Sequence, residues 1–71
     1  MKNNDIYVFI FNRLEDEGIK ISLPKNYETF GIIMVTSESV IIKSNFSERN
    51  IYYREIDKIC IEEGSVAIYQ K

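Results

Sequence analysis

Apolar positions in the first segment, residues 3–17, follow the spacing of an α-helix. Four of them fall on one helical face: Ile6, Phe9, Ile10 and Leu14. Asn3 and Asn4 are good N-caps, and Gly18 suits the position just after a helix C-terminus. The run IYVFIF favours a strand by composition, and the acidic stretch Glu15–Glu17 opposes the helix dipole. We nevertheless predict a helix over residues 3–17.

After Gly18 the apolar period changes to two, which is typical of strands with one buried face. A first strand is expected over Ile19–Leu23, and Pro24–Asn26 should form a turn. Further strands are predicted over Tyr27–Thr36, Val40–Ile42, Ile51–Tyr53 and Asp57–Glu62, with a polar loop over Ser44–Asn50. Ser65–Gln70 is expected to form either one more short strand or a tail.

A glycine in the middle of the longest predicted strand, Gly31, indicates a bend or bulge there. A small barrel needs such a strand, because one strand must take part in both halves of the closed sheet. The predicted fold class is mainly β with one N-terminal helix: a small five-stranded antiparallel barrel of the SH3-like type. Residues 1–71 should form one domain, with the helix over 3–17, barrel strands over 19–62 and a short strand or tail over 63–71.

The length of the chain makes this domain small, and its composition leaves few ways to stabilise it. A chain of 71 residues buries only about 60% of its unfolded surface, so small domains usually need a disulfide, a metal or oligomerisation. Cys60 is the only cysteine and histidine is absent, which rules out an internal disulfide and the usual structural zinc sites. We therefore expect a homo-oligomer with no metal or cofactor, in which Cys60 is a small apolar strand residue.

Charge and motifs restrict the possible functions. The net charge of −2 argues mildly against nucleic acid, although a local basic site can still bind it. No nucleophile motif, phosphate loop or convincing pair of carboxylates is present, so we expect neither an enzyme nor a small-molecule substrate. No apolar run approaches the ~20 residues that span a bilayer, and no signal peptide is recognisable. These features predict a cytoplasmic protein without membrane contact.

Three stretches carry a resemblance to a known family: FNRLEDEGIKISL, YETFGIIMVTSESVIIK and IYYREIDKICI. In this order they resemble the Hfq family of Sm-like RNA chaperones over roughly Ile6 to Glu62. The family's Tyr-Lys-His-Ala-Ile signature matches YYREI only at its first and last positions, Tyr52 and Ile56. The resemblance implies a divergent Sm-like barrel that assembles into a ring, expected to be a hexamer. It also implies binding of short, U-rich single-stranded RNA and aid to RNA–RNA pairing, without covalent chemistry.

The resemblance places the main RNA site at the pore of such a ring. Tyr52, Tyr53 and Arg54 would line the pore, where Arg54 would contact phosphate and Tyr53 would stack on a base. Glu38 and Ser39 match the family's Gln-aromatic pair, so the usual stacking ring is missing there. Without the resemblance, the same residues form a hairpin corner with a solvated arginine.

Two weaker sites follow from the same resemblance. On the rim, Asn12 and Arg13 match positions that contact RNA, but the neighbouring acidic residues repel phosphate. On the distal face, the corresponding residues are Asn26, Tyr27, Thr29 and Phe30. Tyr27 and Phe30 are equally suited to packing between strands.

A second class of function remains open beside RNA binding. The acidic end of the helix and the missing pocket residues also suit a protein-interaction module or a structural oligomer on the same small barrel.

Overall fold

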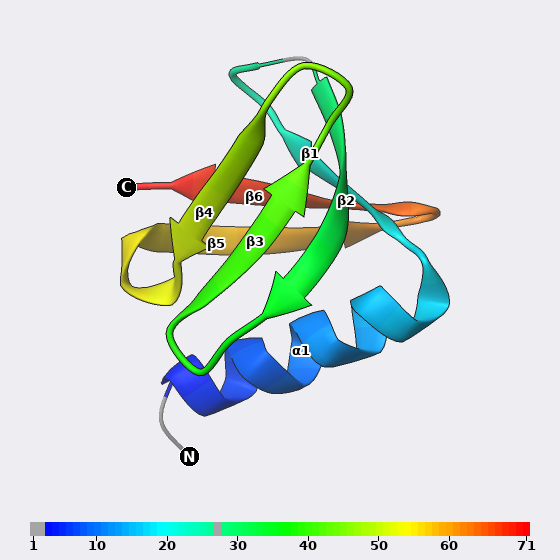
Figure 1. Ribbon diagram of the computed structural model, residues 1–71. Helices are drawn as coiled ribbons and strands as arrows, with labels where there is room; N and C mark the ends of the chain where they lie inside the picture. Colours follow the sequence, from blue (N-terminus) through cyan, green and yellow to red (C-terminus); the bar gives the residue numbers. More distant parts are fainter. Residues whose placement is uncertain (1–2, 27) are drawn as a thin grey trace.

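The chain folds as one helix followed by six strands, in a computed structural model that describes residues 3–26 and 28–71. The elements are α1 (Asn3–Glu17), β1 (Lys20–Leu23), β2 (Glu28–Val35), β3 (Ser39–Lys43), β4 (Glu48–Tyr52), the 3-10 turn η1 (Tyr53–Glu55), β5 (Ile56–Glu62) and β6 (Ser65–Gln70). Figure 1 shows β2, β3 and β4 in front, the β5–β6 hairpin crossing behind them, and α1 along the lower end.

All six strands belong to one sheet, in the order β4-β3-β2-β1-β6-β5. Four neighbouring pairs are antiparallel, but β1 and β6 run parallel, with Lys20 opposite Ser65 and Ser22 opposite Ala67. Among the described residues no pairing joins β4 to β5, so the sheet stays open. The prediction of a mainly β domain with an N-terminal helix is confirmed, whereas the closed five-stranded antiparallel barrel is wrong.

The strand β6 is the physical reason for this difference. Three consecutive residues, Val66, Ala67 and Ile68, are at most 5% exposed. Such a continuous buried run suits a central strand that is covered on both faces. It lies between β1 and β5, so the sheet has six strands with one parallel pair in place of the five antiparallel strands that were predicted. Of the two outcomes expected for residues 65–70, the strand is the observed one.

Helix α1 has the predicted bounds but a different buried face. Phe11 and Leu14 are buried and Tyr7 is half-buried, whereas Phe9 is 62% exposed and Ile6 40%. The predicted face was therefore wrong at Ile6 and Phe9, because an almost entirely apolar segment has more than one stripe at helical spacing. The helix packs against β2 and η1.

A Schellman-type cap ends the helix at Gly18, as the glycine predicted. Gly18 has φ +70°, its backbone N–H donates to the carbonyl of Glu15 at 3.3 Å, and Ile19 N–H donates to that of Leu14 at 3.2 Å. The left-handed backbone reverses the chain, which places Ile19 against the core and directs the chain into β1.

Strand boundaries differ from the predictions mainly around β2 and β4. The irregularity in β2 lies between Ile32 and Met34, next to Gly31 and not at it. The predicted polar loop over 44–50 is shorter, because Glu48, Arg49 and Asn50 already pair with β3. Polar residues are expected in β4, because it is an edge strand with only one neighbour.

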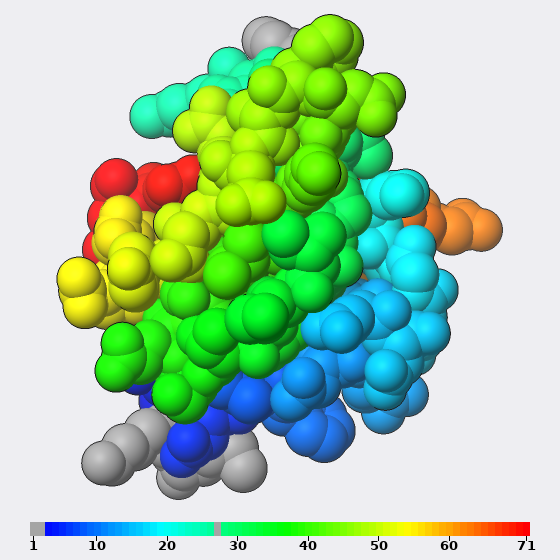
Figure 2. Space-filling view, in the orientation of Figure 1, coloured from blue at the N-terminus to red at the C-terminus, as the bar shows by residue number. Residues whose placement is uncertain are grey.

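The core lies between α1 and the curved sheet, and it takes residues from every element. Its buried members are Phe11, Leu14, Ile21, Leu23, Phe30, Val40, Ile42, Ile51, Tyr53, Ile56, Val66 and Ile68. Figure 2 shows the outer face of β2–β4 as a continuous surface above α1, with the η1 corner protruding on one side and the β5–β6 turn on the other.

Candidate functional site

The corner between β4 and β5 is built around an inward-facing tyrosine. Tyr53 is only 2% exposed, and its ring stacks on Phe11 with centroids 5.8 Å apart and an interplanar angle of 10°. Tyr7 lies against the same ring at 5.7 Å, and the Tyr53 hydroxyl donates a 2.7 Å hydrogen bond to the carbonyl of Thr36. Tyr53 therefore fixes the corner to α1 and has no exposed ring face on which a base could stack, contrary to the role suggested for it.

The environment of Tyr53 changes its ionisation. Desolvation by burial raises the pKa of Tyr53 from 10.0 to about 12, because the phenolate loses hydration inside the fold. The hydroxyl therefore remains a hydrogen-bond donor throughout the physiological range.

Arg54 and Tyr52 form the accessible part of the corner. The Arg54 guanidinium carbon lies 4.9 Å from the centroid of the Tyr52 ring, a cation–π arrangement. Arg54 is exposed and Tyr52 is half-buried, while the Asn50 side-chain amide lies 3.5 Å from the Tyr52 hydroxyl. The pair presents a guanidinium over one face of an aromatic ring, so Arg54 can bind a phosphate and only the uncovered part of the Tyr52 ring can contact a base.

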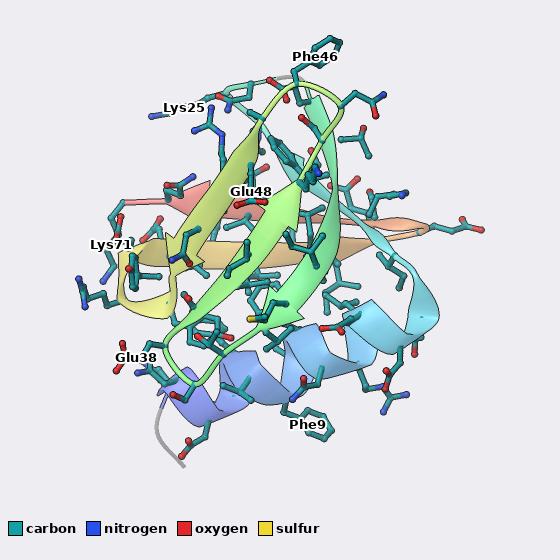
Figure 3. All side chains as sticks on the ribbon, viewed as in Figure 1. Phe9, Lys25, Glu38, Phe46, Glu48 and Lys71 are labelled. Carbon is teal, nitrogen blue, oxygen red and sulfur yellow. The ribbon has the colours of Figure 1, made fainter. Side chains whose placement is uncertain are left out.

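The turn between β2 and β3 brings the two other predicted corner residues to the same place. The carbonyl of Glu38 accepts a 2.9 Å hydrogen bond from the backbone N–H of Tyr53, so the turn and the corner are joined. Ser39 is 4% exposed, its N–H donates to the Thr36 hydroxyl at 2.9 Å, and its own hydroxyl lies 3.0 Å from that oxygen. Ser39 therefore stabilises the β2–β3 turn. The exposed side chain of Glu38 lies on the same turn, where Figure 3 labels it.

The two predicted rim residues lie on α1. Asn12 and Arg13 are both exposed. The Nε atom of Arg13 lies 3.7 Å from a carboxylate oxygen of Glu17, one turn later. Exposed pairs of this kind contribute little stability, but the nearby carboxylate offsets the positive charge that would attract phosphate.

The predicted distal residues do not form one surface. Phe30 is fully buried in the core, whereas Thr29 is exposed. The Asn26 side-chain oxygen, in the amide orientation that satisfies both groups, accepts from the Arg49 guanidinium at 2.6 and 3.2 Å. Tyr27 lies outside the described residues. The structure thus separates Phe30 from Asn26 and Thr29 and assigns it to packing.

A hollow of about 410 Å³ next to Thr29 contains two lysines that the sequence prediction did not include. Lys20 and Lys43 line it together with Ser44 and Asn45. A Cβ atom built on Gly31 would lie 3.7 Å from the Lys20 ammonium, which is an ordinary van der Waals contact, so the position of this lysine does not require a glycine there. Both lysines are exposed on β1 and β3. Strand alternation, which can be read from the sequence, turns them away from the core, so their exposure could have been predicted.

Within the described ranges, no group of three or more acidic or sulfur-containing side chains is arranged to hold a metal ion. No helix among these residues is long and apolar enough to cross a membrane. No protein family, curated protein or solved structure matches the chain in comparisons with known proteins. The corner therefore has to be interpreted from its own geometry.

Proposed function

We propose that the chain assembles head to tail through β4 and β5 and binds short single-stranded RNA at the η1 corner. The observation that carries this proposal is the position of the exposed Arg54 side chain over the half-buried Tyr52 ring. It lies on the turn that joins the two edge strands of the open sheet. Assembly through these edges would bring the corners of neighbouring copies close to one another.

The open edges supply the reason to assemble. Among the described residues β4 pairs only with β3, and β5 only with β6, so each strand has an unpaired row of backbone groups. Contact between β4 of one copy and β5 of the next is heterologous, and such contacts close into a ring when the rotation fits. The family resemblance suggests six copies. The added interface would stabilise a domain that is small for an independent core.

The chemistry of the corner suits RNA in a limited way. Arg54 offers a planar set of donors for phosphate, and the Tyr52 ring offers a surface for a base of any sequence. Tyr53 takes no part, since its ring belongs to the core. With a net charge of −2 per chain, binding rests on few phosphate contacts, so it should depend only weakly on salt concentration. The protein would hold RNA strands and aid their pairing without covalent chemistry.

Light scattering combined with fluorescence anisotropy of a labelled oligo-U tests both parts. We expect a mass of several chains and, at low salt, binding that Arg54→Ala weakens at least about tenfold, because a hydrogen bond to a charged group contributes about 1.5–3 kcal/mol. Arg13→Ala removes an exposed arginine from the rim and should leave binding unchanged. A monomeric mass, or equal binding by wild type and Arg54→Ala, would refute the proposal.

A second candidate is a protein-interaction module or structural oligomer without RNA. It is favoured by two exposed apolar side chains on the outer face of α1, Ile6 at 40% and Phe9 at 62%, which suit a protein contact better than a nucleic acid. An oligomer that binds no RNA and dissociates on Phe9→Ser would support this candidate. An oligomer that dissociates on Phe9→Ser but still binds RNA would contradict this candidate.

A further inference from the structure

We infer that a pocket formed by the β1–β2 turn, β4 and β6 binds a nucleoside phosphate. The pocket has a volume of about 280 Å³ and shares no residue with the Arg54–Tyr52 corner. It depends on β6, which lies beyond the region that resembles a known family. Its size is near the lower end of ligand pockets, so it suits one small ligand or one nucleotide unit.

Three cations line this pocket and no carboxylate side chain does: Lys25 from the turn, Arg49 from β4, and Lys71 just after β6. None of the three forms an ion pair with a described residue, because the ion pair observed among the described residues joins Arg13 to Glu17 on α1. In a chain with net charge −2, three uncompensated cations around one hollow raise the local concentration of anions. Lys25 and Lys71 lie on the same side of the molecule in Figure 3.

Hydrogen bonds hold the polar half of the pocket in place. Asn26 accepts from the Arg49 guanidinium at 2.6 and 3.2 Å, which joins the turn to β4. The turn itself is closed by Asn26 N–H donating to the carbonyl of Leu23 at 2.9 Å. Lys71 N–H donates to the carbonyl of Glu55 at 2.8 Å, which fixes the backbone at the other side. A guanidinium oriented in this way can bind phosphate with little loss of side-chain entropy.

The other half of the pocket is apolar and aromatic, which distinguishes a nucleotide from inorganic phosphate. Leu23 and Ile68 are at most 3% exposed and contribute to the wall together with Pro24. The half-buried ring of Tyr69 also lines the pocket, and Lys58, which is not part of the lining, covers one face of this ring with its ammonium 4.7 Å from the centroid. A cation, an aromatic ring and an apolar wall within one hollow match a ligand that joins a flat base to a phosphate.

Calorimetric titration of the full chain at low salt tests this inference, with adenosine and uridine 5′-monophosphates as ligands. We expect saturable binding, with adenosine or uridine alone at least tenfold weaker because they lack the phosphate. Arg49→Gln and Lys25→Gln should each weaken binding about tenfold. Both replace exposed side chains, so the fold should survive. Lys43→Gln removes an exposed lysine outside this pocket and should bind as wild type does.

Oligonucleotides with and without a 5′-phosphate identify the source of the ligand. Tighter binding of the phosphorylated strand than of free nucleotide assigns the pocket to an RNA end, and the reverse order assigns it to a free nucleotide. Arg54→Ala should bind nucleotide normally, so this inference and the proposed function can fail separately. No binding at millimolar nucleotide, equal affinity for inorganic phosphate, or wild-type affinity in Arg49→Gln would overturn it.

Discussion

The hydroxyl of Tyr53 should stabilise the fold at neutral pH and cease to do so in strong base. Its 2.7 Å hydrogen bond to the carbonyl of Thr36 joins the η1 corner to the end of β2. Replacement of Tyr53 by phenylalanine keeps the stacking on Phe11 but removes this bond and leaves the carbonyl unpaired. We expect a loss of about 1–2 kcal/mol in the free energy of unfolding at pH 7.

The raised pKa of Tyr53 makes this difference depend on pH. Between pH 10 and about 12 the unfolded chain loses the phenolic proton while the folded chain keeps it. The folded state then binds more protons, so stability falls as the pH rises. Two pKa units correspond to at most about 2.7 kcal/mol, and solvent at the half-buried Thr36 should reduce this to about 1–2 kcal/mol. The advantage of the wild type is therefore lost near pH 11–12.

Urea unfolding of wild type and Tyr53→Phe at matched protein concentration, from pH 8 to 11.5, measures the effect. The other tyrosines occur in both proteins, so their ionisation cancels in the difference between the two. Tyr52→Phe is the matched control, since the Tyr52 hydroxyl has only a 3.5 Å contact with Asn50, and it should stay within about 0.5 kcal/mol of wild type at pH 7. A difference between wild type and Tyr53→Phe that stays constant over this pH range would refute the reasoning.

Two further predictions concern backbone and loop. Gly18→Ala should lower the free energy of unfolding by about 1 kcal/mol, because a backbone φ of +70° disfavours a Cβ atom. Gly31→Ala should be neutral or slightly stabilising, because only the flexible end of Lys20 lies nearby. Equal shifts of the melting temperature in the two variants would contradict this prediction. Ser44→Ala should lower the free energy of unfolding, measured by chemical denaturation, by about 1–2 kcal/mol. The Ser44 hydroxyl accepts hydrogen bonds from the N–H groups of Phe46 and Ser47 at 3.1 Å and donates one to a Glu28 carboxylate at 2.6 Å. The control Asn45→Ala replaces an exposed side chain and should change the free energy of unfolding little. A loss in Asn45→Ala as large as that in Ser44→Ala would show that the hydroxyl is not the cause.

Local signals predicted the helix and most strand positions well. Gly18 marks the observed end of α1, because a glycine acts through the backbone nearby, and the predicted start at residue 3 agrees with the first described residue of the helix. The alternation of Ile19–Leu23 gave β1 to within one residue. The proline turn is likewise where it was predicted, with its hydrogen bond from Asn26 to Leu23.

Choices that depend on tertiary packing could not be predicted in the same way. Whether Phe9 or Phe11 faces the sheet is settled by contact with Tyr53, which is distant in sequence. The parallel pair in the sheet depends on β6 taking the place beside β1. The run SVAIY after a glycine turn was a readable sign of a central strand, since buried strands are continuously apolar.

The sequence placed Glu38 near Tyr53, but it did not distinguish the surroundings of Tyr52 from those of Tyr53. The corner does bring Glu38 close to η1 through its bond to Tyr53, but the two tyrosines have opposite environments. Strand alternation provides the reason, because Ile51 and Tyr53 face inward and Tyr52 between them does not. A resemblance based on the order of residues does not account for this alternation.

The parallel pair in the middle of the sheet has a consequence for synthesis of the protein. Strands β1 to β4 can form successive hairpins as they leave the ribosome, but β1 has no partner on its other side until residues 65–70 have been made. Parallel pairing across such a separation is slow. The nascent chain therefore exposes a hydrogen-bonding edge that the β5–β6 hairpin of another copy can occupy, so we expect misfolding of this chain to occur by exchange of this hairpin between chains.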